Sequence, residues 1–269
     1  MPKAEVLLKV IPQLLGGQLM DGPTFWAAAG VIATVLIFGL TWLRDVHKER
    51  KVNAELSVEG ASWVLERGND YEEFLRLLLS LDHAALVGLT DSSAGSAELK
   101  AKVFEKSPET WSLVVFRDSL VVGYWSLFSL SPKLIKRLER GVMFDREIVE
   151  SEIFSIEKEA THNFYVEMFG MHPAFRQSER RIFRMLLQSL NEFAIKLNRD
   201  GVRVGAVYAA GFSDKGASLC RRFGLTAIAK SDQGGDVYCT RDIGALFVKI
   251  EQLAGKRLPG TSQARIVDR

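Results

Sequence analysis

The feature that most restricts what this chain can form is an uncharged apolar run over residues 24–43. A helix of that length crosses a hydrocarbon core of roughly 30 Å. Trp26 and Trp42 lie near its two ends, which suits indole rings whose apolar body and polar N–H both find partners at a membrane surface. We therefore expect one transmembrane helix over residues 24–43, with a buried core helix as the alternative.

The charges on either side of this run predict its orientation. Residues 44–51 hold four Lys or Arg residues, whereas residues 1–23 hold only Lys3 and Lys9. By the positive-inside rule, the large C-terminal part faces the cytoplasm. A cleaved signal peptide fits less well, because Arg44 follows the apolar run directly where a small-residue cleavage site would stand. We expect a single-pass protein of the cell inner membrane with a short extracytoplasmic segment, 1–23.

The composition excludes several other classes of protein. The 269 residues are 47% hydrophobic and 25% charged, which is typical of a water-soluble domain for the bulk of the chain. A net charge of +2 gives no overall positive field to attract nucleic acid. The two cysteines, Cys220 and Cys239, and four scattered histidines have no paired spacing that would hold zinc. Neither a nucleic-acid partner nor a structural metal is expected.

Beyond the anchor, the periodicity predicts an α/β domain over residues 61–242, preceded by a linker at 44–60 and followed by a C-terminal helix and tail at 243–269. Arg117 and Asp118 separate two apolar strands and predict a hairpin turn. Helices are expected at 70–80, 95–106, 133–140, 177–198, 215–223 and 243–253. Strands are expected at 61–66, 111–116, 119–128, 164–171, 202–208, 225–229 and 236–240.

This order of elements resembles the GCN5-related N-acetyltransferase (GNAT) superfamily over roughly residues 61–240. GNAT proteins end their fourth strand with Val-x-Pro, and an Arg-x-x-Gly-x-Gly turn then opens a helix. Here Pro173 and Arg176 match, but Glu179 and Arg181 occupy both glycine positions. The resemblance implies a mixed, mostly antiparallel sheet flanked by helices.

A second pattern supports the same resemblance. The family's Asn-x-x-Ala-x-x-Leu-Tyr-x-x-x-Gly-Phe stands here between Ser213 and Leu225, with the spacing kept and Cys220 at the tyrosine position. In GNAT enzymes this tyrosine commonly protonates the leaving thiolate. The resemblance therefore implies that Cys220 donates that proton; the alternative is that Cys220 is a small buried hydrophobic residue.

The resemblance implies acetyl-CoA or acyl-CoA as co-substrate, with its pyrophosphate against the amides that begin the helix after Pro173. Glu179 would repel the phosphates there, whereas Arg180 and Arg181 would attract them. A solvated, charged first turn of an ordinary amphipathic helix is the alternative. The expected coenzyme-binding residues are Met171, His172, Arg176, Gln177, Ser178, Glu179, Arg180, Arg181 and Ser213.

A general base is expected on the strand before that turn. Glu167 is the only carboxylate between Thr161 and Arg176, and simple alternation places it on the same face as Tyr165 and Phe169. His162 and His172 are alternative bases, and the alternative to catalysis is that Glu167 is a solvent-facing or salt-bridged strand residue.

The function expected from these patterns is a membrane-anchored, acyl-CoA-dependent N-acyltransferase with an unknown amine acceptor. Its expected partners are the lipid bilayer, a coenzyme A thioester and the amine, with a second copy of the chain as a further candidate. One alternative is a catalytically inactive GNAT-like sensor or scaffold at the membrane. Another is an enzyme like acyl-homoserine-lactone or N-acyl amino acid synthases, in which the arginines between Arg176 and Arg184 dock an acidic acyl carrier protein.

Overall fold

The computed structural model describes residues 55–60, 62–66, 71–85, 97–142, 148–232 and 234–255. The predicted transmembrane helix at 24–43 and the segment 1–23 lie outside the described residues, as do most of the predicted linker and the tail beyond 255. The chain divides after Lys51 into two units, and the described residues all belong to the second. No helix among them is both long and apolar enough to span a membrane.

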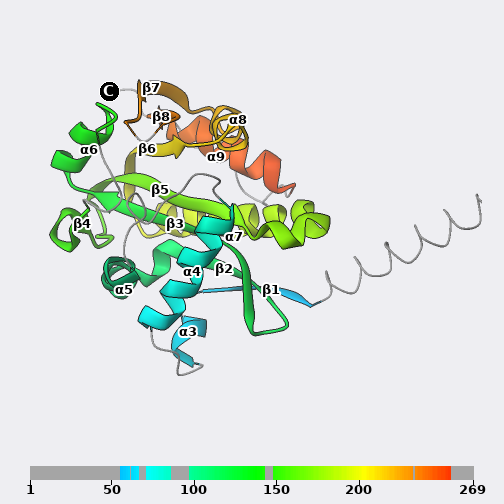
Figure 1. Cartoon of the computed structure of the whole chain (residues 1–269). Coiled ribbons are helices and arrows are strands. Elements are labelled where there is room, and N and C mark those ends of the chain that lie inside the picture. The colour runs from blue at the N-terminus through cyan, green and yellow to red at the C-terminus, as the bar shows by residue number, and fades with distance from the viewer. Residues whose placement is uncertain are drawn as a thin grey trace, which may run out of the picture. The chain divides into compact units, whose positions relative to one another are not determined.

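The described residues form a mixed α/β fold around one eight-stranded sheet that is mostly antiparallel, as expected (Figure 1). The strand order is β1-β2-β3-β5-β6-β8-β7, and β4 pairs with β3. Strands β5 and β6 form the parallel pair. The strands are β1 (Leu56–Glu59), β2 (Trp111–Phe116), β3 (Leu120–Leu130), β4 (Ile153–Phe154), β5 (Thr161–Met171), β6 (Arg203–Gly211), β7 (Thr226–Lys230) and β8 (Asp236–Thr240).

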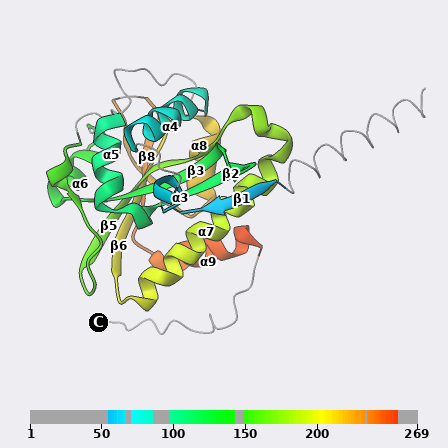
Figure 2. The same ribbon diagram turned by 90° about the horizontal axis from the view of Figure 1, so that it is seen from below.

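Helices cover both faces of this sheet. Figure 2 shows α4 and α5 on one face and α7 and α9 on the other. The helices are α3 (Ser62–Glu66), α4 (Tyr71–Ala85), α5 (Ala97–Lys106), α6 (Pro132–Leu138), α7 (Glu179–Arg199), α8 (Asp214–Arg222) and α9 (Ile243–Ala254). Short 3₁₀ helices lie at η1 (Pro108–Thr110), η3 (Glu150–Glu152) and η4 (Pro173–Ser178).

Each face of the sheet has its own apolar core. On the α4/α5 face the rings of Phe74, Phe104, Trp111 and Tyr124 follow one another at centroid distances of 5.4–6.1 Å. On the α7/α9 face, alternate residues of the strands pack against the apolar side of α7, whose buried members recur at helical spacing. The sheet is therefore buried on both sides, which fits the nearly continuous apolar sequence of β3.

The predicted elements from residue 70 onward are confirmed, and the first element is corrected. Residues 61–66 were expected to form a strand, but Ser62–Glu66 is the helix α3. Trp63 and Val64 are both buried in the same core cluster. Adjacent residues of a helix can face the same core, whereas adjacent residues of a strand point to opposite faces. The first strand, β1, lies instead in the predicted linker and pairs with β2.

The hairpin between β2 and β3 turns where the sequence predicts. Arg117 and Asp118 have φ angles of 53° and 52°. Two successive residues with positive φ match the twist that joins adjacent antiparallel strands tightly. At the other end of the fold, α9 packs along α7 and onto β6, so the folded unit extends past residue 242 to Gly255.

Candidate functional site

The parallel strands β5 and β6 separate partway along their length. They pair from Thr161 with Arg203 as far as Val166 with Ala209. Beyond that point β5 continues beside β3 to Met171, while β6 continues beside β8 to Gly211. The sheet is therefore open between the C-terminal ends of these two strands.

A β-bulge lies where the strands separate. Ser126 of β3 pairs with Met168 and the next residue, Leu127, pairs with Val166, so Glu167 has no partner residue in this ladder. It has none in the ladder with β6 either. Bulges of this kind leave one peptide unpaired and re-aim the neighbouring side chains, and they are frequent beside active sites.

The bulge changes which side chains share a face with Glu167. Tyr165 and Met168 both belong to the core on the α4/α5 face, and Glu167 between them points to the same face, toward Lys100 of α5. Phe169 instead packs with the core on the α7 face. The prediction that Glu167 and Phe169 share a face is therefore wrong, because the extra residue in the strand reverses the alternation after it.

Glu167 belongs to a buried cluster of charges. Lys100 Nζ lies 2.5 Å from Glu167 Oε1 and 2.7 Å from Asp82 Oδ2. Tyr124 donates a hydrogen bond to Asp82 Oδ1 and Ser126 donates one to Glu167 Oε2, each at 2.5 Å. The three charged side chains are only 4–5% exposed. Two carboxylates thus share a single ammonium group in a dry environment.

Burial and charge act on these groups in opposite directions. Desolvation raises the pKa of Asp82, and the neighbouring Glu167 adds to this, whereas Lys100 opposes it. Burial alone would lower the pKa of Lys100, but the attraction of Glu167 and Asp82 outweighs it and raises that pKa. Lys100 is therefore held as a charged ammonium across the physiological range.

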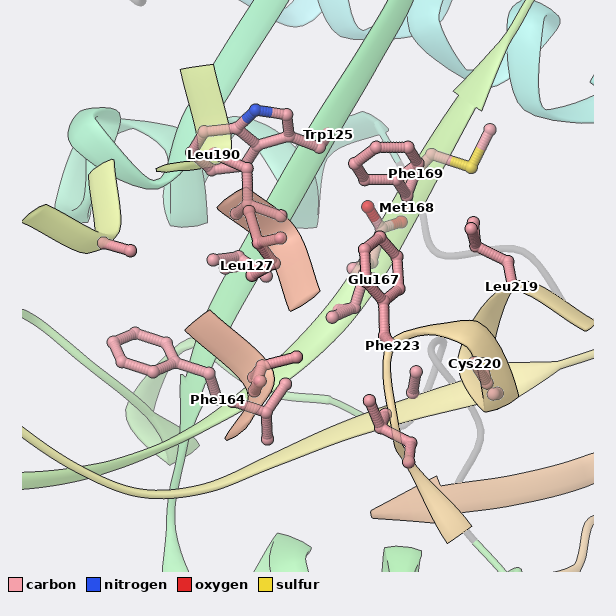
Figure 3. A pocket seen from close by; sticks show the side chains of 18 of the residues that line it. Trp125, Leu127, Phe164, Glu167, Met168, Phe169, Leu190, Leu219, Cys220 and Phe223 are labelled. Atoms are coloured by element: carbon pink, nitrogen blue, oxygen red, sulfur yellow. The ribbon is translucent and has the colours of Figure 1, made fainter. Parts of the chain in front are cut away.

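An apolar cavity of about 150 Å³ begins at the gap between the strands (Figure 3). Glu167 and Met168 line it from the α4/α5 side, whereas Phe164, Val166 and Phe169 line it from the α7/α9 side. The cavity thus reaches both faces through the gap. Its remaining lining comes from β3, β6, α7, α8, α9 and the residues that flank α8, and Ser213 is the one exposed residue in it.

A cavity of this size is costly if it serves nothing. Apolar side chains that line such a space lose the contacts that a packed core would give them. Native cores contain few voids larger than a water molecule. Such a space beside an unpaired peptide and a buried carboxylate is the natural place for a ligand.

A close approach of α8 to β6 shapes one wall of the cavity. A Cβ on Gly211, at the end of β6, would lie 2.9 Å from the ring of Tyr238 and 3.0 Å from the Cα of Ala217 in α8. Ser213 then caps α8 by accepting a hydrogen bond from the amide of Gly216 at 3.1 Å. These contacts set α8 directly after the strand, so that Leu219 and Cys220 face the cavity.

The predicted coenzyme-binding residues lie in sequence around the opening of α7. Met171 ends β5 beside Gly123, and the His172 ring accepts a hydrogen bond from the Ala174 amide at 3.1 Å. Arg176 and Gln177 lie exposed in η4, while Ser178 is buried. Because η4 runs directly into α7, the Glu179 amide donates to the Arg176 carbonyl and is not free for an anion.

Exposed cations gather near these helix starts. Arg180 and Arg181 are exposed in the first turn of α7. Glu179 is half exposed and lies 3.8 Å from Lys215 of α8, so its charge has a partner and its side chain does not fill the cavity. The pair also shows that the first turns of α7 and α8 are neighbours. An anion approaching the gap would meet more positive than negative charge.

The remaining predicted residues divide between cavity and core. Burial raises the pKa of the Cys220 thiol to about 11, so Cys220 lines the cavity as a neutral, weakly acidic group. His162 is buried at the start of β5, with its Nδ1 2.8 Å from the Ser129 hydroxyl and its other nitrogen beside Glu157. His172 is engaged with the backbone of η4, and neither histidine lines the cavity.

The site also contains residues that no sequence pattern above predicts. Asp82 and Lys100 come from helices α4 and α5, and Tyr124 and Ser126 come from β3. Trp125 of β3 also lines the cavity, and its indole N–H donates to the Ser189 hydroxyl at 2.7 Å. Lys100 could have been suspected, because it lies among apolar residues on the buried side of an amphipathic helix.

No known protein family matches the sequence, and no curated protein is similar to it. Among solved structures, the chain is similar to PH1933 from Pyrococcus horikoshii OT3, with 15% identity and a TM-score of 0.42 over 70% of this chain and 99% of that one. An acetyltransferase from Streptococcus agalactiae 2603 has 10% identity and a TM-score of 0.42 over 70% and 98%. The ribosomal-protein-S18-alanine N-acetyltransferase from Escherichia coli has 10% identity and a TM-score of 0.36 over 68% and 90%. Similarities at this level assign no activity to the chain.

Proposed function

We propose that this protein is an acyl-CoA-dependent N-acyltransferase of the GNAT type. The observation that supports this most is the cavity that passes through the gap between β5 and β6 and reaches Glu167. Residues from both faces of the sheet line the cavity at this gap, and an acyl donor and an amine acceptor would meet there. Such an arrangement suits group transfer between two substrates.

The donor would lie on the α7/α8 side of the gap. The pantetheine arm fits the apolar lining near Leu219 and Phe223, and the phosphates would lie near Arg180, Arg181 and Lys215. Because η4 occupies the Glu179 amide, side-chain cations would do much of the work that backbone amides do in a glycine-rich turn.

The acceptor would meet the thioester beside Glu167. A carboxylate offers about four acceptor positions, and Lys100 and Ser126 occupy two on Glu167. A remaining position would take a proton from the amine as its nitrogen attacks the thioester carbonyl carbon. The C–N bond forms, the C–S bond breaks, and the thiolate takes up the proton that the amine released and leaves as coenzyme A thiol. The unpaired peptide at Glu167 is well placed to polarise the carbonyl.

The test is thiol release from acetyl-CoA and longer acyl-CoAs by the full-length protein with a panel of primary amines. We expect amine-dependent release of free coenzyme A, and we expect Glu167→Gln to reduce kcat by about 10²- to 10⁴-fold. Glu192→Gln, an exposed change on α7, is the matched control and should have no effect. Release that is unchanged in Glu167→Gln would remove Glu167 from the mechanism.

A second function has a specific observation in its favour. The ion pair between Lys100 and Glu167 is the arrangement of a structural salt bridge, and it engages the carboxylate that catalysis would need. A binding or scaffold domain that keeps the cavity without transferring an acyl group would account for it. Tight acyl-CoA binding without turnover with any amine, together with full ligand affinity in Glu167→Gln, would favour this function.

We also propose that the domain is tethered to the cell inner membrane by residues 24–43, with the domain in the cytoplasm. The support is the uncharged run and the basic residues that follow it. On fractionation, the full-length protein should be found with the membranes. It should resist extraction by salt or carbonate. Release of the intact chain by either treatment would contradict the tether.

A further inference from the structure

The inner part of the cavity differs in chemistry from its mouth. We use "inner part" for the space enclosed by Trp125, Phe164, Phe193, Ala194, Leu197 and Leu246, all less than 9% exposed. The first two belong to the sheet, the next three to α7 and the last to α9. In Figure 3, Trp125 and Phe164 lie on one side of the view and Leu219 and Cys220 on the other, with Glu167 between them.

We infer that this inner part receives the hydrocarbon chain of a medium-length acyl group of about six to eight carbons. The inference rests on the proposed function and specifies its donor. With the phosphates at the starts of α7 and α8 and the thioester carbonyl at the bulge, the acyl chain begins beside Glu167 and continues away from the coenzyme. The space available in that direction is the inner part.

The chemistry of the lining selects hydrocarbon over a polar group. The inner part presents only aliphatic and aromatic side chains, and the one N–H among them, on the Trp125 indole, is bonded to Ser189. An amine or hydroxyl placed there would lose its hydrogen bonds to water and find no replacement. The acceptor amine therefore does not occupy this space.

The size of the cavity sets the length of the chain. The whole cavity, including its mouth near Leu219, has a volume of about 150 Å³, which equals that of a known apolar cavity that holds one benzene ring, so this volume is an upper limit for the chain. Its lining follows β6 from Val204 to Ala210, which is about 20 Å of strand. A space of at most this volume that is lined along one strand suits a flexible chain of about six to eight carbons better than a bulky ring system.

The experiment is calorimetric titration of the full-length protein with acetyl-CoA, hexanoyl-CoA, octanoyl-CoA and palmitoyl-CoA. We expect hexanoyl- and octanoyl-CoA to bind at least about tenfold more tightly than acetyl-CoA. Each added methylene group would be transferred from water to an apolar environment. Palmitoyl-CoA should not show this higher affinity, because its acyl chain is too long for the cavity.

Variants of α7 localise the effect. Ala194→Phe fills the inner part and should remove the preference for longer chains while acetyl-CoA affinity stays within about twofold. Ile195→Phe adds the same ring at the next position, which is 40% exposed, and should leave the preference intact. Should Ala194→Phe fail to fold, Leu197→Ala enlarges the space and should shift the preference toward longer chains.

The outcomes separate this inference from the proposed function. Equal affinity for acetyl- and octanoyl-CoA, or the same chain preference in Ala194→Phe as in Ile195→Phe, overturns the inference and leaves the acyltransferase intact. Absence of binding by every acyl-CoA overturns both.

Discussion

Lys100 Nζ lies 2.5 Å from Glu167 Oε1, and this contact joins helix α5 to the one residue of β5 that the sheet leaves unpaired. Asp82 holds the same ammonium group from α4 at 2.7 Å. The contact holds the Glu167 carboxylate at the gap between β5 and β6. The position of this carboxylate therefore depends on α4 and α5, which are far from it in sequence.

We predict that Lys100→Met destabilises the protein by about 3–5 kcal/mol, because it leaves two buried carboxylates without their partner. The measurement is urea unfolding at neutral pH. Lys102→Met, on the same helix but with a side chain 51% exposed, should change stability by less than about 0.5 kcal/mol. Equal losses in the two variants would show that Lys100 adds no more than a surface lysine.

The same variant has a predicted pH dependence. Burial raises the pKa of Asp82 in the folded protein above its unfolded value, so its contribution to stability is present at low pH and is lost as the pH rises through the folded pKa. The charge of Lys100 opposes the increase in the pKa of Asp82, so this pKa should be still higher in Lys100→Met. The stability difference between Lys100→Met and wild type should therefore be larger at pH 7 than near pH 4. A difference independent of pH would contradict the shared ammonium.

Gly211→Ala should destabilise the protein by about 1–3 kcal/mol and weaken ligand binding at the cavity. The added Cβ would meet the Tyr238 ring at 2.9 Å and the Ala217 Cα at 3.0 Å, which pushes α8 away from β6. Gly60→Ala is the control, because no heavy atom lies within 4 Å of its added Cβ. Thermal unfolding of both variants checks this, and a Gly211→Ala protein as stable as Gly60→Ala would argue against the close approach.

The Cys220 thiol should react slowly with alkylating reagents until the pH nears 11, because burial raises its pKa to about that value from 9.0. The rate is best measured by mass spectrometry in a Cys239→Ala background, since Cys239 is also a free thiol. Saturation with acyl-CoA should slow the reaction further, because Cys220 lines the cavity. Rapid alkylation at pH 8 would mark Cys220 as an activated thiol instead.

Arg180→Ala combined with Arg181→Ala should weaken acyl-CoA binding by about three- to tenfold at low salt, and less near 1 M salt, where charges are screened within about 3 Å. Arg199→Ala, at the other end of α7, carries a similarly exposed guanidinium and serves as the control. A loss no greater than that in Arg199→Ala would place the phosphates elsewhere.

Most of the fold could be predicted from local patterns because each pattern is set by nearby residues. The α7 stripe of apolar side chains and the Arg117-Asp118 turn are examples. The segment at 61–66 was misassigned because Trp63 and Val64 face the same core, and six residues are too few to reveal a period.

The candidate site was less predictable because its defining contacts are long-range. The sequence places Glu167 on the strand before the turn, but the face toward which its side chain points depends on a bulge that only the pairing with β3 creates. Its partner Lys100 is 67 positions earlier in the chain (167 − 100), and no spacing rule connects the two. The cavity depends likewise on how α9 packs beside α7, which no local pattern contains.

The most direct test of the central claim is hydrogen exchange of the full-length protein, followed by mass spectrometry, with and without hexanoyl-CoA. If the acyl thioester lies in the gap between β5 and β6, protection should concentrate in peptides covering residues 166–170 and 209–220 and should be absent with hexylamine alone. Unchanged exchange in those peptides at saturating hexanoyl-CoA, or protection confined to other parts of the chain, would contradict the account.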